Sequence, residues 1–354
     1  MTPRPPVTAP YAGSPLLTPG RTIAVITTYN RASLLAGLLE SIAREPVAPA
    51  AVVVIDNASE DETPALLEGL AGGLEGPRGH TVPLVVERLP RNTGGAGGFR
   101  RGMELALSER FDALVPREER WVWLMDDDVA LIPGGLARLA ARELRADVIH
   151  GARLNADGTP FFWRHVLDPA TGVHWPMREP ARSAPVAETN VACFEGALVS
   201  ALTAETVGLP DARFFLGSDD TTYGFLASRA VRVVVCDEPL LRKMRAQASI
   251  DLRVRHLNDA SDLSRRLTLR NRALMAQHLA RVGAHSPARF ALGTALTAAK
   301  EAVRLLAVEA PAAVREDGVR AAAARAARSA AAIARGLREA RQVRSGRLDL
   351  GPLP

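Results

Sequence analysis

Four short apolar runs, separated by helix-compatible stretches, constrain the fold of this chain most strongly. Runs of this kind, rich in β-branched residues, are typical of strands that are buried on both faces of a sheet. Strands that alternate with helices predict right-handed βαβ units, and therefore an α/β fold with a mostly parallel central sheet and flanking helices. The runs occupy residues 22–28 (TIAVITT), 51–55 (AVVVI), 83–88 (PLVVER) and 121–125 (WVWLM).

Polar residues follow three of these runs, close to the point where each strand should end. Asp56 follows the second run, Asn92 comes shortly after the third, and Asp126–Asp128 follow the fourth. Because ligands of open α/β sheets collect outside the carboxyl ends of the strands, these residues should surround one nucleotide site. Taken alone, Asp56 fits a helix cap as well as an acceptor for a base or ribose.

The three adjacent carboxylates of Asp126, Asp127 and Asp128 indicate a cation, because neighbouring negative charges repel one another unless they are neutralised. Side chains alternate along an extended chain, so the first and third should face one way and Asp127 the other. Hard divalent ions such as Mn²⁺ or Mg²⁺ prefer such oxygen ligands together with substrate phosphates. The alternative is a solvated turn, or a cap for a helix near Pro133.

A glycine-dense segment from Arg91 to Phe99 predicts a turn that opens a helix over 102–108. Glycines in such a turn let backbone N–H groups approach a phosphate or sugar closely. The spacing differs from the dinucleotide fingerprint, and no acidic partner follows about 20 residues later. A plain loop is the alternative.

Two further groups lie in the second half of the chain. Asp219 and Asp220 precede a helix expected over 223–230, where a carboxylate can deprotonate a hydroxyl or simply cap the helix. Four aromatic side chains could stack on sugar rings, although core or lid packing is the more frequent reason for such a cluster; they are Phe161, Phe162, Trp163 and Trp175.

The positive charge of the chain is concentrated near one end. Residues 311–354 hold nine Arg against four acidic residues, and this excess equals the net charge of +5 of all 354 residues. A near-neutral body argues against nucleic acid as a partner, because positive charge should coat a recognition face. The tail predicts either a solvated helix end or contact with an anionic membrane, through Arg325, Arg328, Arg335, Arg338 and Arg341.

The remaining composition predicts a cytoplasmic enzyme, with peripheral docking on the inner face of the plasma membrane as an addition. The first 20 residues lack the apolar stretch of a signal peptide. No run of about 18 uncharged apolar residues predicts a transmembrane helix. Cys193 and Cys236 lack partners at metal-ligand spacing and fit a reducing compartment.

The expected organisation has three parts, and the oligomeric state stays open, a homo-oligomer included. A disordered leader should cover residues 1–20, a catalytic domain 21–250, and a helical region with the basic tail 251–354. The catalytic domain should divide into a donor half, 21–130, and an acceptor half, 131–250.

Taken in order, the sequence blocks resemble glycosyltransferase family 2, whose members have the GT-A fold and use nucleotide-diphospho-sugars. The NTGGAGGF segment and the triple Asp are most similar to bacterial galactofuranosyltransferases of cell-wall galactan synthesis. Rhamnosyltransferases that use dTDP-rhamnose are close relatives in the family. The blocks lie within residues 21–275 and are VITTYNRASLLAGLLESI, VVVIDNASEDET, RLPRNTGGAGGFRRGMELAL, WVWLMDDDVALIPGGL, FEGALVSALTAETVGLPDARFFLGSDDTTYGFLASR and LTLRNRALM.

The resemblance implies roles for the matching residues. Asp126 and Asp128 would bind Mn²⁺ or Mg²⁺, and Asp220, beside Asp219, would be the catalytic base. Glu195 and Gly196 fall where relatives bind the acceptor, with Trp163 as an added aromatic contact. The residues expected around the donor are Thr28, Asp56, Arg91, Asn92, Gly94, Gly95, Gly97, Gly98, Asp126, Asp127 and Lys243.

One departure from the family concerns the third metal ligand. Relatives often carry Trp-His shortly after the strand that follows the base helix, and this His completes the metal shell. Arg242 and Lys243 stand there in this chain. Lys243 would then pair with the diphosphate as a point charge. His256, further along, is the alternative ligand.

The function implied is an inverting transfer of a sugar, with galactofuranose from UDP-galactofuranose as the first expectation. The acceptor would be a hydroxyl of a cell-wall or lipid-linked glycan. A rhamnosyltransferase, a nucleotidyltransferase and a glycan-binding homologue without catalysis are the alternatives. A nucleotidyltransferase would need glycines after the first strand, where this chain has Thr27 to Arg31.

Overall fold

The computed structural model describes residues 13–77, 79–161, 163–245, 249–251, 256–258 and 261–351. The four predicted strands are present as β1 (Thr22–Thr28), β2 (Ala51–Asp56), β5 (Leu84–Arg88) and β6 (Trp121–Asp126). They run parallel in the order β6-β1-β2-β5. The helices between them are α1 (Ala32–Ala43), α2 (Thr63–Gly69) and α3 (Gly94–Ala106), so the βαβ prediction is confirmed.

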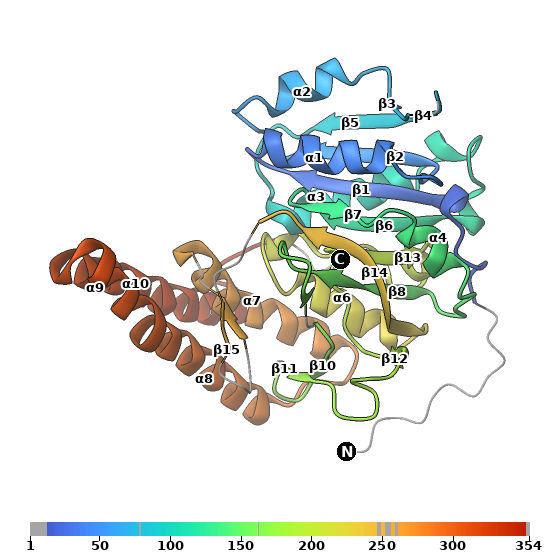
Figure 1. Cartoon of the computed structure of the whole chain (residues 1–354). Coiled ribbons are helices and arrows are strands. Elements are labelled where there is room, and N and C mark those ends of the chain that lie inside the picture. The colour runs from blue at the N-terminus through green and yellow to red at the C-terminus, as the bar shows by residue number, and fades with distance from the viewer. Residues whose placement is uncertain are drawn as a thin grey trace.

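The second half of the chain extends the same sheet on the other side of β6 (Figure 1). Strand β13 (Ala197–Ser200) lies antiparallel between β6 and β8 (Val148–Leu154). Beyond β8 come β14 (Val233–Lys243) and β12 (Val186–Glu188), while β7 (Val129–Leu131) and β9 (Pro160–Phe161) pair at the periphery. The α/β fold class with a central sheet and flanking helices is confirmed.

Short elements complete this body. The helices are α4 (Gly135–Ala140), α5 (Ala201–Val207) and α6 (Asp219–Ser228). The two-stranded pairs are β3 (Leu74–Glu75) with β4 (Thr81–Val82), β10 (His165–Asp168) with β11 (Val173–Pro176), and β15 (Ser249–Asp251) with β16 (His256–Asn258). Single 3-10 turns are η1 (Pro19–Arg21), η2 (Glu109–Phe111), η3 (Arg117–Glu119) and η4 (Ala212–Phe214).

Helices cover both faces of the sheet, and the strands are apolar for that reason. Alternate residues of β1 point to opposite faces, so Ala24 and Ile26 share one core with α1, while Ile23 and Val25 share the other with α3. All seven residues of β1 are buried. A strand that is buried on both sides has its register and its ends held firmly, which positions the residues at its carboxyl end.

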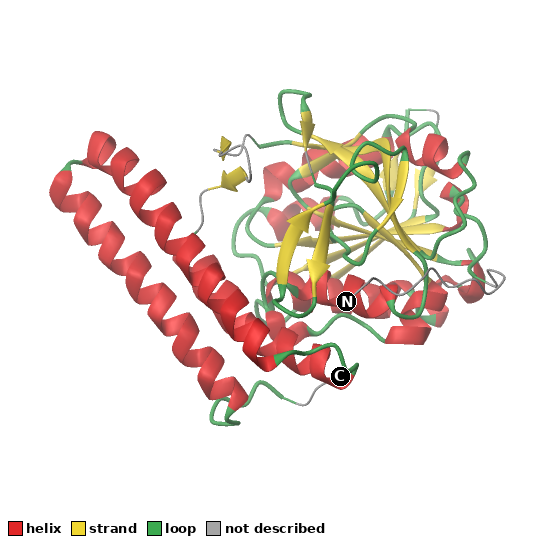
Figure 2. Cartoon of the chain, turned by 90° about the horizontal axis from the view of Figure 1, so that it is seen from below, coloured by secondary structure: helices red, strands yellow, loops and turns green. Residues whose placement is uncertain are grey.

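A helical arm follows the body and projects away from it (Figures 1 and 2). Helix α7 (Asp262–Arg281) leads to α8 (Pro287–Val303), a short π-helical stretch η5 (Arg304–Glu309), α9 (Ala310–Asp317) and α10 (Val319–Arg344). Helix α10 runs back beside α7 with buried residues every seventh position: Ala322, Ser329, Gly336 and Val343. This repeat matches the seam of a coiled coil, so the predicted tail is a packed helix.

Three expectations need correction. The disordered leader was expected to reach residue 20, but the chain is packed from Ser14, whose backbone N–H and hydroxyl donate to Asp147 at 3.0 and 2.9 Å. Leu17 is buried as well. Residues 1–12 lie outside the described part. The helix expected from residue 102 begins at Gly94, and the one expected from 223 begins at Asp219. The division at residues 130 and 250 stays a prediction.

No helix within the described residues combines the length and the apolar character needed to cross a membrane.

Glycines of α3 allow this helix to lie close against β1. A Cβ at Gly102 would stand 2.3 Å from Cγ1 of Val25, whereas a Cβ at Gly95 would have its nearest neighbour at 4.0 Å. We expect Gly102→Ala to lower the free energy of unfolding by about 1–3 kcal/mol, because the buried strand cannot move aside. Gly95→Ala is the matched control and should be neutral or stabilising. Urea unfolding measures both, and equal stabilities would contradict the packing argument.

Candidate active site

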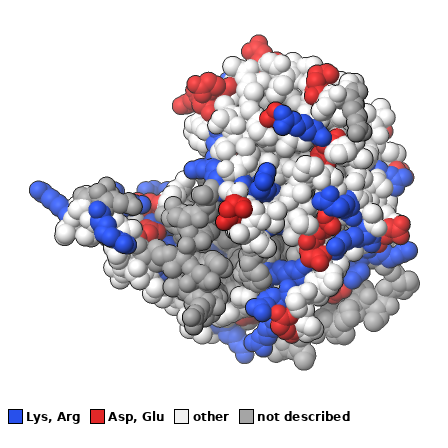
Figure 3. Space-filling view, in the orientation of Figure 1, with Lys and Arg blue, Asp and Glu red and all other residues white. Residues whose placement is uncertain are grey.

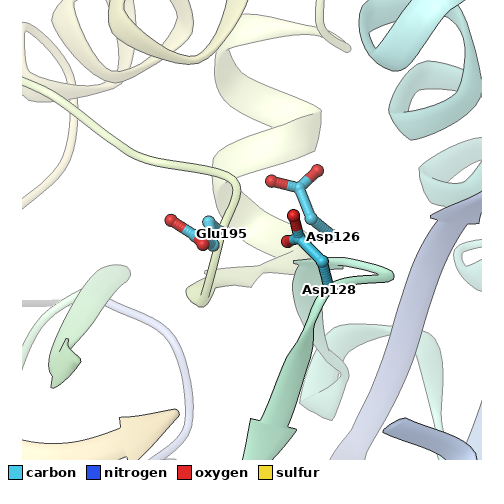
Figure 4. Close-up of side chains that lie close together, drawn as sticks. All are labelled: Asp126, Asp128 and Glu195. Carbon is cyan, nitrogen blue, oxygen red and sulfur yellow. The ribbon is translucent and has the colours of Figure 1, made fainter. Parts of the chain in front are cut away.

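Three carboxylates from two separate segments meet at the carboxyl end of β6 (Figure 4). One oxygen each of Asp126, Asp128 and Glu195 lies within 4.8 Å of the others. Glu195 reaches the site because the following strand, β13, pairs with β6, and the Gly196 N–H donates to the Leu124 carbonyl at 2.7 Å. An all-oxygen group of this kind has the chemistry that binds hard divalent cations.

Asp127 points away from this cluster. Its carboxylate accepts a hydrogen bond from the Thr28 hydroxyl at 2.7 Å and one from the Arg31 guanidinium at 2.9 Å. Asp126 and Asp128 thus share one side, as side-chain alternation predicts. The Thr28 hydroxyl and the Asp127 carboxylate are hydrogen-bonded to each other. A nucleotide-sugar that contacts either side chain would do so in addition to this hydrogen bond. Their donor-binding roles stay predictions.

Three cations border the carboxylates, and the first is Arg31, whose guanidinium lies 3.4 Å from Oδ2 of Asp128. Nζ of Lys243 lies 2.8 Å from Oε1 of Glu195, and the guanidinium of Arg153 contacts Oε2 of the same carboxylate. The ring of Phe161 lies under the latter two cations, 4.8 Å from Nζ of Lys243 and 4.7 Å from Cζ of Arg153. Such cation–π contacts hold the two charges in place.

Strand pairing explains why Lys243 reaches the cluster. Strand β14 pairs with β7, which follows the Asp turn directly, so that Lys243 is opposite Val129. The next residue, Met244, donates its backbone N–H to the Asp128 carbonyl at 2.9 Å. Lys243 therefore lies at the acidic cluster. The other candidate, His256, has its side chain outside the described part.

Burial and like charge raise the pKa of Asp126 well above its ordinary value. The cause is desolvation first, then the charges of Glu195, Asp128 and Asp127, with Lys243 acting in the opposite direction. Burial also raises the pKa of Asp127, against the influence of Arg31 and Thr28. The cluster is therefore short of positive charge. Its residues fit a divalent ion, with Asp126, Asp128 and Glu195 as the ligands.

Arg153 is a functional candidate that the sequence analysis missed. Its side chain is only 4% exposed, and its Nη2 has no hydrogen-bond partner among the described residues. Buried donors are rarely left unsatisfied unless a ligand completes them. The only sequence signal is a charged residue within the strand VIHGARL. Trp163 packs on the same guanidinium at 5.5 Å and on His150 at 5.1 Å, which makes it part of the site wall.

Asp56 lies at the carboxyl end of β2, two strands away from β6 and the carboxylate cluster. It is 1% exposed, accepts a hydrogen bond from the Ser59 N–H at 2.9 Å and lies 3.4 Å from Arg88. It also borders a cavity of about 380 Å³ whose walls include Leu67, Val86 and Arg88. Cavities of this size suit small ligands, and a base is an aromatic group of fitting dimensions.

The glycine segment is a helix start rather than the predicted turn. Close packing explains its glycines, because a side chain would not fit. A Cβ at Gly94 would lie 2.0 Å from the Phe215 carbonyl oxygen, and a Cβ at Gly98 would lie 2.3 Å from Cγ2 of Thr27. A Cβ at Gly97 would meet Thr93 at 2.4 Å. Of the four glycines expected at the donor, Gly95 alone would have open space at its Cβ.

Asn57 ties this helix start to β2. Its side chain accepts from the N–H and hydroxyl of Thr93 at 2.8 and 2.9 Å and donates to the Gly94 carbonyl at 2.8 Å. Asn92 accepts from the Gly94 N–H at 2.8 Å. Arg91 is exposed, and no hydrogen bond or ion pair of its side chain is found among the described residues. It is available to a ligand.

The acidic pair Asp219 and Asp220 forms the first turn of α6. Desolvation and the neighbouring Asp220 raise the pKa of Asp219 to about 8. Desolvation raises the pKa of Asp220 to about 6, with Glu195 raising it further and the Thr221 N–H and Arg153 lowering it. Asp220 thus lies close enough to Arg153 and Glu195 for their charges to act on it, and its role as the base stays a prediction. The lower pKa of Asp220 favours it as the member of the pair that ionises first.

The loop before this pair is held by helix α7. Asn271 is fully buried, and its amide donates to the carbonyls of Phe214, Leu216 and Gly217 at 3.0, 2.9 and 2.7 Å. Arg270 donates to the Phe214 carbonyl at 2.6 Å. Phe215 has φ 63°, a conformation that non-glycine residues avoid. The Arg-Asn motif thus fixes the loop that orients Asp219 and Asp220.

The cluster geometry predicts that Glu195 contributes to binding Mn²⁺. Glu195→Gln removes a charge at constant size and should weaken Mn²⁺ at least roughly 10-fold, since hard cations favour charged oxygen ligands. Isothermal titration calorimetry with MnCl₂ measures the affinity. Glu238→Gln is the matched control, because Glu238 is similarly buried and pairs with Arg138, away from the cluster. Equal affinities for both variants would exclude Glu195 as a ligand.

Comparison with known proteins identifies the family of this chain. The family model for glycosyl transferase family 2 matches residues 23–199. Galactofuranosyltransferase GlfT1 of Mycolicibacterium smegmatis is 28% identical over 212 residues, which are 56% of this chain and 62% of that protein. GlfT1 of Mycobacterium tuberculosis H37Rv is 30% identical over 212 residues, which are 56% and 61%. The chain thus matches about three fifths of the length of these curated relatives.

A solved structure supports the fold alone. The crystal structure of Staphylococcus aureus TarS 1-349 aligns with a TM-score of 0.50 at 17% identity and covers 92% of this chain and 91% of that one. Since the family model spans half of the sequence, including β1, β2 and the Asp cluster, this chain belongs to glycosyl transferase family 2.

Proposed function

We propose that this protein is an inverting glycosyltransferase that moves a sugar from a nucleotide-diphospho-sugar to a hydroxyl of a glycan. The observation that carries the proposal is the meeting of two acidic groups on one site, a three-carboxylate cluster and the separate Asp220. The first suits a cation on a diphosphate, and the second suits a base toward a hydroxyl. The family membership supports the same reaction class.

The transfer is a single displacement. The acceptor oxygen forms a bond to the anomeric carbon, while the bond from that carbon to the diphosphate oxygen breaks and its electron pair leaves with the nucleotide. Asp220 takes the hydroxyl proton. Attack from the side opposite to the leaving group inverts the configuration of the anomeric carbon.

The chain's own cations assist the leaving group. Lys243 lies beside the carboxylates as a point charge, and Arg153 offers a buried donor that has no partner among the described residues. Both suit phosphate oxygens. Asp126, Asp128 and Glu195 would hold Mn²⁺ or Mg²⁺, which when bound supplies Lewis-acid neutralisation of the diphosphate.

The donor is assigned by position and by relatives. Asp56 and its cavity would take the uridine, with Asn92, Arg91 and Gly95 along the diphosphate and sugar. The galactofuranosyltransferases among the relatives favour UDP-galactofuranose, and dTDP-rhamnose is the second candidate. The acceptor is a cell-wall or lipid-linked glycan, with Trp163 in the wall of its binding site.

Nucleotide release from a donor panel tests this function. UDP release from UDP-galactofuranose that Mn²⁺ or Mg²⁺ supports and EDTA removes is the expected result, because the carboxylates need a cation. Release from dTDP-rhamnose instead would move the enzyme to the second donor. If no donor is consumed and none binds by calorimetry, the protein is a glycan-binding homologue and the proposal is wrong.

Asp220 and Asp219 offer a matched pair for testing the base. Asp220→Asn should lower kcat at least roughly 100-fold, since a positioned base contributes about 10²–10⁴-fold. Asp219→Asn should retain most activity, because the pKa of Asp219 near 8 leaves it protonated at neutral pH.

The pH profile adds a second readout. A base must be ionised, so kcat of the unaltered enzyme should fall as the pH decreases through about 6, the raised pKa of Asp220. Initial rates between pH 4.5 and 8 measure this limb, and circular dichroism confirms folding of each variant. If Asp219→Asn is the inactive one and Asp220→Asn is not, the assignment of the base is reversed.

A further inference from the structure

Helix α8 presents an apolar stripe to solvent. Leu292, Leu296 and Val303 are 57%, 48% and 52% exposed and fall at i, i+4 and i+11, which share one face of a helix. The exposed alanines Ala291, Ala295 and Ala299 lie along one side of this line and widen the stripe. Leu306, one turn further in η5, is 68% exposed. Exposed apolar side chains gathered in a continuous patch usually mark an interaction site.

The stripe lies on the outer side of the arm. The opposite face of the helix is the packed one, with Phe290, Gly293 and Glu301 buried. Gly293 is pressed so closely on the body that a Cβ would lie 1.9 Å from the Thr171 carbonyl oxygen. No described residue packs over the stripe sufficiently to bury it, so the helix is amphipathic with its apolar face outward.

The exposed charges on the described surface of the arm are mostly basic. Its buried acids are neutralised inside: Glu309 and Glu301 pair with Arg265, and Glu339 pairs with Arg266. Arginines instead point outward, and blue side chains mark the outer end of the arm in Figure 3. The exposed arginines of helices α7 to α10 are Arg281, Arg289, Arg315, Arg320, Arg325, Arg328, Arg335, Arg338, Arg341 and Arg344.

We propose that the arm docks on an anionic lipid bilayer, with the α8 stripe inserted at the headgroup boundary and arginines on the lipid phosphates. An outward apolar face flanked by basic residues is the design of an interfacial helix. Arg289 and Lys300 lie on one edge of the stripe. A second copy of the chain is the less favourable occupant, because two arginine-rich arms would repel one another.

Liposome flotation of the full-length protein tests the proposal, without donor or acceptor, so that its outcome is independent of the enzymatic activity. The probes are vesicles of phosphatidylcholine alone and of phosphatidylcholine with 30% phosphatidylglycerol. The protein should float with the second and not with the first. Binding should weaken between 0.1 and 0.5 M salt, because the arginine contribution is screened.

Matched variants separate the two parts of the surface. Leu292→Ser with Leu296→Ser should lower the partition coefficient at least roughly 10-fold, whereas Val47→Ser with Leu114→Ser, 49% and 51% exposed on the body, should not change it. Arg325→Gln with Arg328→Gln should lower it roughly fivefold per arginine. Arg145→Gln with Arg229→Gln, both exposed on the body, is the control for charge.

Three outcomes would overturn the proposal. One is flotation with neither vesicle, and another is equal flotation of the arm and body variants. The third is a dimer seen by light scattering that the Leu292→Ser, Leu296→Ser variant abolishes while lipid binding is absent, which would assign the stripe to a second copy. Thermal unfolding of each variant confirms that the arm is folded.

Discussion

The mutual repulsion of three carboxylates within 4.8 Å is the constraint around which the rest of the catalytic body is arranged. Such a group cannot be held together by its own side chains, so the sheet must hold it. Strand β6 supplies Asp126, β7 follows Asp128, and the antiparallel strand β13 brings Glu195 alongside. The hydrogen-bonded ladders oppose the separation that the charges favour, while Lys243 and Arg153 relieve part of the repulsion.

The acidic pair on α6 depends on a different support. Its loop has a strained residue, Phe215, whose carbonyl accepts from the Ala96 N–H at 3.1 Å and lies against Gly94. From the other side, Asn271 of α7 satisfies three carbonyls of the same loop. The glycine helix, the loop and the arm are therefore one packed unit. Side chains far apart in the sequence thereby set the position of Asp220.

The local sequence pattern was sufficient to predict those elements whose structure depends on neighbouring residues. The apolar runs predicted β1, β2, β5 and β6, since burial on both faces determines their composition. The alternation of Asp126 to Asp128 followed from backbone geometry. The glycine segment was predicted as a turn because the contacts that require its glycines are tertiary. A side chain at Gly94 would collide with Phe215 and one at Gly98 with Thr27, and a local pattern does not reveal these neighbours. Glu195 comes beside Asp126 through the pairing of β13 with β6, and Arg153 lies opposite Phe161 of β9 and Leu241 of β14; no short motif encodes these registers.

The arm leaves the body and returns to it. Helix α7 starts it beside the catalytic loop, and after α10 the chain comes back so that Arg213, in that same loop region, donates to the Gly351 carbonyl at 3.0 Å. Leu348 and Leu350 pack on the core shared by Phe214 and Leu274. A projection anchored at both ends cannot swivel on a single hinge. The arm is therefore held in a fixed orientation relative to the body. A surface that binds the arm would also determine the distance and the angle of the carboxylate cluster relative to that surface.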